Sequence, residues 1–167
     1  KGLLNSRREL VFPPAGGAKG IKAVASILGG RDTELPLTLL DSDGQGSKFA
    51  QDLRTGLYVE VPGRVLQVGS FLDIEGAEVE DLIPQDIITK AVNRMIREPE
   101  SPFETCQGPQ RPIVPQIEQW ASDGGVTLQK GWKVDLAKRV KRVLLDGETV
   151  PEVTFEIWKR LFESFQA

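Results

Sequence analysis

Apolar residues recur along this chain at spacings that separate helices from strands. IKAVASILGG has the period of a helix that ends near Gly29 and Gly30, and its apolar face consists of Ile21, Val24, Ala25 and Leu28. ELVFPP, LPLTLL and RVLQVGS are short runs, and the last two are nearly continuous in apolar residues, as expected of buried parallel strands. SKFAQDLRTGL has a helical period again, with Ser47 as its predicted N-cap. Alternating strands and helices predict an α/β fold, a parallel sheet flanked by helices.

The pattern in the second half of the chain predicts mainly helices. GAEVEDLIP is predicted to be a strand or a loop at the sheet end, and PQDIITKAVNRMIRE a helix whose inward positions are Ile88, Ala91, Val92, Met95 and Ile96. The Pro-rich stretch EPESPFETCQGPQRPIVP predicts a mobile connection. Three helices are predicted after it, near 115–122, at 132–145 and at 151–165, the last with an apolar stripe of Phe155, Trp158, Leu161, Phe162 and Phe165. We therefore predict an α/β domain over 1–100 and a C-terminal helical appendage over 101–167.

The amino-acid composition excludes several classes of catalytic and metal-binding site. The chain has 167 residues and no histidine, which excludes Ser-His-Asp catalysis, Cys-His catalysis and zinc sites that contain His. Cys106 is the single cysteine, so no disulfide framework exists and a reducing, cytoplasmic setting is predicted. No apolar run approaches the roughly 20 residues of a membrane span. The first residues lack both a Met and a signal peptide, so we expect a fragment of a longer protein.

Charge is clustered within a formal net charge of −3. Acidic residues gather from Asp73 to Asp86 without a base among them, and bases gather between Lys130 and Arg142. Solvated faces are the plainer interpretation of such clusters. The basic cluster is also the candidate nucleic-acid-binding segment, through Lys130, Lys138, Arg139, Lys141 and Arg142.

The stretch DSDGQGS follows a predicted strand and allows three interpretations. An EF-hand calcium loop needs a preceding helix and a Glu at its twelfth position, and the chain offers a strand and Asp52. A haloacid-dehalogenase-like phosphatase would use Asp41 as nucleophile and Asp43 as acid/base, but no late GDxxxD motif follows. A carboxylate pair holding Mg²⁺ requires further acids at another strand end.

GAEVEDLIP supplies those acids. In an extended segment Glu78 and Glu80 would point to one face and Asp81 to the other. Two carboxylate pairs after neighbouring strands could hold one or two ions for phosphodiester hydrolysis.

The chain contains, in this order, PPAGGAKGIKAV, LLDSDGQG, AEVEDLIP and KGWKVDLAKRV. This ordered set resembles the TOPRIM domain of the OLD (overcoming lysogenisation defect) family of nucleases, over roughly 10–142. The resemblance makes 1–100 the predicted catalytic domain. The resemblance implies metal binding by Asp41 and Asp43 with Glu78 and Glu80, and a catalytic lysine at Lys133, with Lys130 as runner-up. It implies Mg²⁺ or Mn²⁺ as cofactor, with Ca²⁺ binding without supporting cleavage, and Glu80 as a catalytic residue as well as a ligand.

The family's first strand ends in a metal-binding Glu, and we expect that strand to lie upstream of Lys1. The resemblance further implies DNA as partner, an ATPase domain in the same full-length chain, oligomer contacts through the missing region, and a bacterial or phage-encoded protein in phage defence. A phosphatase using Asp41, a non-catalytic TOPRIM binding module and another TOPRIM enzyme stay open. A topoisomerase would need Tyr58, the single tyrosine, as its nucleophile.

Overall fold

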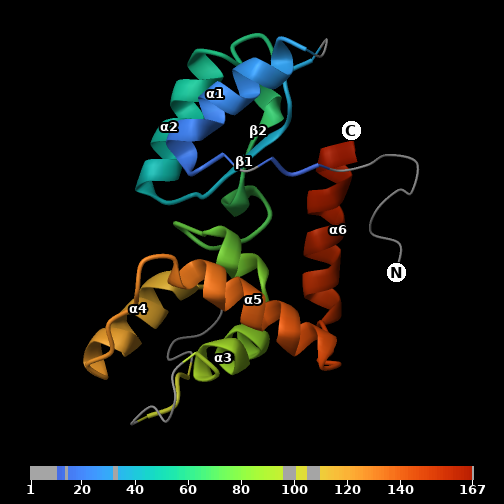
Figure 1. Ribbon diagram of the computed structural model, residues 1–167. Helices are drawn as coiled ribbons and strands as arrows, with labels where there is room; N and C mark the ends of the chain where they lie inside the picture. Colours follow the sequence, from blue (N-terminus) through green and yellow to red (C-terminus); the bar gives the residue numbers. More distant parts are fainter. Residues whose placement is uncertain (1–10, 14, 32–33, 96–100, 105–109, 167) are drawn as a thin grey trace.

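The computed structural model describes residues 11–13, 15–31, 34–95, 101–104 and 110–166, and it has a mixed α/β fold. Figure 1 shows an upper sheet lobe (α1, β1, α2, β2), a lower helical lobe (α3, α4, α5) and a last helix, α6, beside both. The bounds are α1 Ala18–Gly29, β1 Thr38–Leu40, α2 Gly44–Thr55, β2 Val65–Gln67, α3 Gln85–Asn93, α4 Ile113–Asp123, α5 Trp132–Leu145 and α6 Glu152–Gln166. Short 3-10 turns are η1 Pro62–Arg64, η2 Val68–Ser70 and η3 Val79–Leu82.

The sheet of the described residues has two parallel strands. Thr38 of β1 lies opposite Val65 of β2, and Leu40 lies opposite Gln67. The strands predicted from LPLTLL and RVLQVGS are confirmed, although each is shorter than its apolar run. Residues 11–13 of ELVFPP belong to no strand. GAEVEDLIP, predicted to be a strand or a loop at the sheet end, forms no strand and contains the turn η3. Glu9, Leu10 and Pro14 lie outside the described residues.

The sheet lobe has its own apolar core. It consists of Ala25, Leu40, Ala50, Leu53, Tyr58 and Val65. Tyr58 is fully buried, its hydroxyl donates to the carbonyl of Pro36 at 2.9 Å, and the hydroxyl of Thr38 is also 2.9 Å away. A buried phenol with both hydrogen bonds made is not available as a nucleophile, so this structure argues against the topoisomerase interpretation.

Replacing Tyr58 with phenylalanine is expected to lower the free energy of unfolding by about 1–3 kcal/mol, because the Pro36 carbonyl loses its buried donor. Burial raises the pKa of Tyr58 above its ordinary value, against the Thr38 hydrogen bond and the Arg64 charge. Because the folded pKa is raised, this stabilisation is complete below about pH 10 and is lost as the pH rises further. Urea unfolding of both proteins at pH 7 and above pH 10 measures the difference. A stability gap that widens at high pH would contradict the assignment.

The helical lobe is built from α3, α4 and α5. Its buried core consists of Ile87, Ile88, Ala91, Val92, Phe103, Ile113, Val114, Ile117, Leu136, Val140 and Val143. The predicted helices after residue 110 are confirmed, and so is the helix of α3 with Ile88, Ala91 and Val92 inward; Ile96 lies outside the described residues. The apolar core crosses residue 100, because α3 packs with α4 and α5. The predicted domain boundary at that residue stays a prediction.

The predicted mobile connection is wrong over 101–104. Phe103 is 1% exposed and packs edge-on against Trp120 at a ring distance of 5.5 Å. Its backbone N–H donates to the side chain of Asn93 at 2.7 Å, and its carbonyl accepts from the same side chain at 3.0 Å. A buried aromatic with both backbone groups bonded anchors this segment to the lobe. Residues 96–100 and 105–109, which include Cys106, lie outside the described part of the chain.

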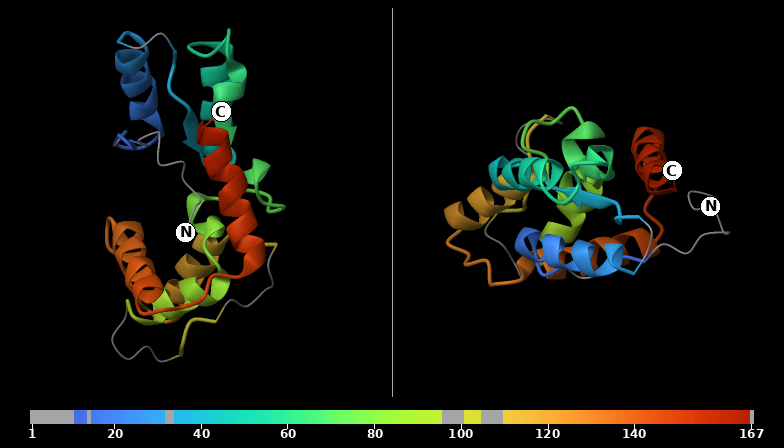
Figure 2. Two further views of the ribbon diagram at one scale, coloured as in Figure 1. Left: turned by 90° about the vertical axis from the view of Figure 1, so that its right-hand side faces the viewer. Right: turned by 90° about the horizontal axis from the view of Figure 1, so that it is seen from above.

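The last helix joins the two lobes. Figure 2 shows α6 leaving the helical lobe and running up beside the sheet lobe. Leu161 and Phe165 of the predicted apolar stripe, together with Ile157, pack with Val68, Ala77 and Leu82. The indole of Trp158 donates to the carbonyl of Leu82 at 2.7 Å. The predicted packing role is confirmed for Trp158, Leu161 and Phe165 of the stripe. None of the described helices is both long and apolar enough to cross a membrane.

Candidate functional site

The DSDG turn begins directly after β1. Asp43 is the N-cap of α2, and its carboxylate accepts a hydrogen bond from the N–H of Gly46 at 2.6 Å. The prediction that Ser47 caps this helix is wrong, because α2 begins three residues earlier, at Gly44. Glycines disfavour helix interiors, so Gly44 and Gly46 hid the true start, and the Asp side chain compensates by satisfying a free N–H. One carboxylate oxygen of Asp43 therefore caps the helix.

The acidic segment forms a 3-10 turn and not an extended strand. The alternation expected for a strand therefore does not apply to Glu78 and Glu80. Both still approach the same cation, the ammonium group of Lys133. Asp81 is directed elsewhere and accepts from the N–H of Glu78 at 2.8 Å and of Ile113 at 2.7 Å. The predicted division of these acids between two sides holds, but a turn produces it.

Hydrogen bonds hold the two acidic segments side by side. The N–H of Val79 donates to the carboxylate of Asp41 at 3.0 Å. The N–H of Ser42 donates to the carbonyl of Ala77 at 2.7 Å, and the Ser42 hydroxyl accepts from Gly69 at 2.7 Å. Asp41 thus lies against the turn that carries Glu78 and Glu80. Asp43, in contrast, forms no hydrogen bond or ion pair with the acids or the lysine of this described region.

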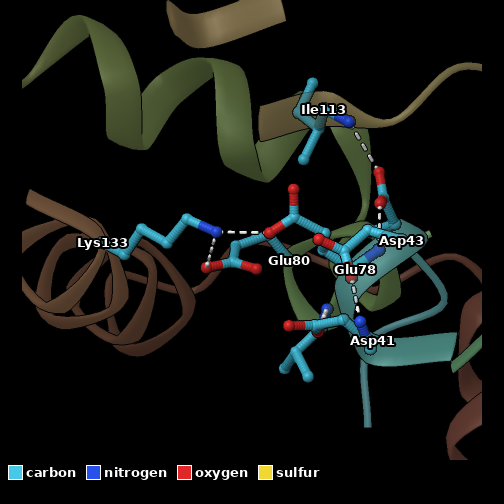
Figure 3. A network of polar contacts seen from close by, with 9 residues as sticks. Asp41, Asp43, Glu78, Glu80, Ile113 and Lys133 are labelled. Carbon is cyan, nitrogen blue, oxygen red and sulfur yellow. Dashed lines mark hydrogen bonds and ion pairs between the residues drawn. The ribbon is translucent and has the colours of Figure 1, made fainter. Parts of the chain in front are cut away.

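Lys133 reaches this cluster from the first turn of α5 (Figure 3). Its ammonium group forms an ion pair and hydrogen bond with Glu78, and it lies 3.8 Å from a carboxylate oxygen of Glu80. The side chains of Glu78 and Glu80 are 14% and 20% exposed. Lys130 is exposed and forms no hydrogen bond or ion pair with the described residues. Of the two candidate lysines, the structure places Lys133 at the acids.

The local electrostatics favour a cation beside the turn. Burial raises the pKa of Glu78 above its ordinary value, against the hydrogen bond and charge of Lys133, which lower it. Burial alone would lower the pKa of Lys133, but the hydrogen bond with Glu78 and the charges of Glu80 and Asp41 raise it on balance. An ammonium held here therefore keeps its proton more strongly than in water.

Carboxylate oxygens are the donors that Mg²⁺ and Mn²⁺ prefer, and Mg²⁺ commonly uses one or two of them and keeps several waters. Glu78 and Glu80 already converge on one cation, which is what such a pair requires. Among the described residues no three acidic, histidine or cysteine side chains converge closely enough to hold an ion as they stand. The donors fit a hard cation, provided that Lys133 moves and Asp41 turns toward the pair.

Two of the five predicted nucleic-acid-binding residues have a bonding partner in the structure. Arg139 donates to the carbonyl of Arg94, and Lys138 lies 3.3 Å from Asp135 on the same helix. Lys130, Lys141 and Arg142 are exposed, and their side chains form no hydrogen bond or ion pair within the described part of the chain. Arg139 thus bonds within the protein in this structure, and nucleic-acid binding by all five residues stays a prediction.

Sequence reasoning missed one functional position. Asp81 ties the acidic turn to the first residue of α4 through its bonds to Glu78 and Ile113, so it fixes where Glu78 and Glu80 lie. The signal was present: acids three residues apart, as in Glu78 and Asp81, match the N-cap and N3 spacing of a capping pattern. The assumption of an extended segment concealed it.

Comparison of the chain with family models, with curated proteins and with solved structures finds no match. The resemblance to TOPRIM nucleases therefore rests on the ordered motifs, and the function has to be argued from the site.

Proposed function

We propose that this chain is the metal-dependent nuclease domain of a larger protein and hydrolyses phosphodiester bonds of DNA. The observation that carries the proposal is the meeting of Glu78 and Glu80 with Lys133, beside Asp41 at the end of a parallel strand. The ends of parallel strands are where open α/β sheets bind ligands. Carboxylates for a hard cation and a lysine for a phosphate are the two groups that this reaction needs.

Each residue has a separate task in the proposed reaction. Asp41, Glu78 and Glu80 would hold Mg²⁺ or Mn²⁺, as one ion or two, and Asp43 would contribute its remaining oxygen. Divalent ions bound there would activate water and stabilise charge on the scissile phosphate. The Lys133 ammonium stabilises negative charge that develops on the phosphate oxygens in the transition state. The exposed Lys130, Lys141 and Arg142, with Lys138, bind the phosphate backbone, and that binding should weaken steeply with salt.

A groove beside β1 supports a larger, TOPRIM-like sheet. In the described residues, the outer edge of β1 forms no backbone hydrogen bond with another strand. An apolar groove of about 660 Å³ runs along that edge, lined in part by Leu37, Leu39, Leu161 and Val79. We propose that the upstream strand implied by the resemblance pairs with this edge of β1. The resemblance expects the upstream glutamate at the end of that strand. It also suggests the ATPase partner domain, the cytoplasmic location and a role in phage defence.

The test is nicking of supercoiled plasmid by the full-length protein with Mg²⁺, Mn²⁺, Ca²⁺ or EDTA. We expect nicking with Mg²⁺ and Mn²⁺ only, and a loss of about 100-fold or more in Asp41→Asn and Glu80→Gln. Glu163→Gln is the matched control, because Glu163 is exposed on α6 and forms no hydrogen bond or ion pair with the described residues. Asp43 is tested as Asp43→Asn, since an amide oxygen still caps α2 whereas Asp43→Ala removes the cap as well.

Nicking that persists in both Asp41→Asn and Glu80→Gln, or that is absent with every ion, would overturn the nuclease proposal. Turnover of small phosphomonoesters with a phospho-aspartate at Asp41 would indicate the phosphatase instead. Metal binding without any turnover would indicate a binding module.

A further inference from the structure

Lys133 occupies the position where the two turn glutamates converge. Its ammonium group bonds Glu78 and lies 3.8 Å from Glu80, and Asp41 adds a third negative charge nearby. The backbone around these acids holds them in place: Asp41 accepts from Val79, and Asp81 clamps the turn against α4. The backbone of the acidic turn is thus held in place, and the cation that its glutamates contact belongs to the protein itself.

We propose that Lys133 is the resident counter-ion of the acidic turn in the metal-free protein, and that a divalent ion binds Glu78 and Glu80 only by displacing it. The inference rests on the proposed function, because it assigns the order of events at that same site. The ammonium group of Lys133 lies at Oε2 of Glu78 and Oε1 of Glu80, so a divalent ion at these two oxygens would be strongly repelled by its like charge. Binding of the ion and release of the lysine are therefore one exchange.

The structure allows this exchange without unfolding. Lys133 follows Gly131 and Trp132 at the start of α5, so its stem begins at a helix end. Its side chain is 39% exposed, and within the described part of the chain its ion pairs are with the two glutamates alone. A four-carbon stem with a solvated end can swing away by rotation about its single bonds. The released ammonium remains beside the site, where it can meet a phosphate.

Replacing Lys133 with a neutral residue should therefore change the affinity for a divalent ion and the rate of cleavage in opposite directions. Removing the ammonium removes the competitor, so the carboxylates bind a divalent ion more tightly. It also removes the group that stabilises the phosphate, so cleavage falls. A lysine that only contacted DNA would leave the affinity for the ion unchanged, and a lysine that helped to build the ion site would weaken it.

The experiment is isothermal titration of Mn²⁺ into the full-length protein without DNA. We expect Lys133→Met to bind Mn²⁺ about tenfold more tightly than the unaltered protein, and Lys133→Arg, which keeps the charge, to bind it about equally. Lys22→Met is the matched control, because Lys22 is exposed on α1 and forms no ion pair with the described residues, so the affinity of this variant for Mn²⁺ should not change. Circular dichroism melts establish that each variant is folded. If Lys133→Met does not fold, Lys133→Gln takes its place.

Equal or weaker Mn²⁺ binding by the neutral variant overturns the inference, as does an absence of Mn²⁺ binding in every protein. The two proposals fail separately. Tighter Mn²⁺ binding in Lys133→Met with no nicking by the unaltered protein would keep the exchange and reject the nuclease. Metal-dependent nicking with unchanged affinity in Lys133→Met would keep the nuclease and reject the exchange.

Discussion

Gly46→Ala is expected to disrupt the DSDG turn and to lower the free energy of unfolding by about 3 kcal/mol or more. A Cβ at Gly46 would stand 2.2 Å from the carbonyl oxygen of Asp41 and 2.8 Å from its carbonyl carbon. Backbone atoms cannot yield as a flexible side chain can, so either the turn or the start of α2 must shift. The shift would move Asp41 away from Val79, and metal-dependent nicking should fall with stability.

Gly44→Ala is the matched control for this prediction. It lies two residues earlier in the first turn of α2, and a Cβ there meets nothing within 4 Å. Chemical denaturation and plasmid nicking of both variants test the pair. Equal stability of Gly44→Ala and Gly46→Ala would show that the close approach of Gly46 to Asp41 is not a constraint in solution.

Phe103→Ala is expected to lower the free energy of unfolding by about 3–5 kcal/mol, the range for deleting a buried aromatic ring. The ring is 1% exposed and lies in the core shared by α3, α4 and α5. Its loss leaves a cavity beside Trp120 and loosens the segment that Asn93 holds. Because α5 carries Lys133, we also expect weaker alignment of that lysine with the acidic turn.

Phe12→Ala provides the same chemical change at a position that is 67% exposed, and it should cost well under half as much. Urea unfolding at equilibrium compares the two variants. If Phe103→Ala lowers the free energy of unfolding only slightly, residues 101–104 would be a mobile connection, as their composition suggested.

The local spacing of apolar residues predicted the secondary structure correctly where one face of an element packs against a core. The apolar spacing in IKAVASILGG and in the last helix found α1 and α6, since a helix that buries one stripe must repeat it every three or four residues. The two short strands were found because parallel strands are covered on both faces. The extended form considered for GAEVEDLIP, in which acids spaced by two share a face, is wrong, because a capped 3-10 turn forms there. Alternation over so few residues does not separate these two structures.

The connection after α3 failed for a different reason. Pro-rich, polar composition indicates a loop, and the described part has no regular helix or strand until α4. Composition does not reveal that one ring of such a loop is buried. Phe103 is fixed by Asn93 and Trp120, which lie 10 and 17 positions away in the chain.

The sequence alone determined where most of the helices and the two strands lie, and it named the acids and the lysine of the candidate site, because these depend on residue type and local spacing. Only the tertiary structure decided that Lys133 meets Glu78 across 55 positions, that Asp41 backs the same turn, and that Asp43 uses an oxygen to cap α2. The physical reason is that periodicity reports which face of an element is buried, but not against which distant segment. That choice is made by the joint packing of α3 and α5 and by hydrogen bonds such as those of Asp81, which no local pattern specifies.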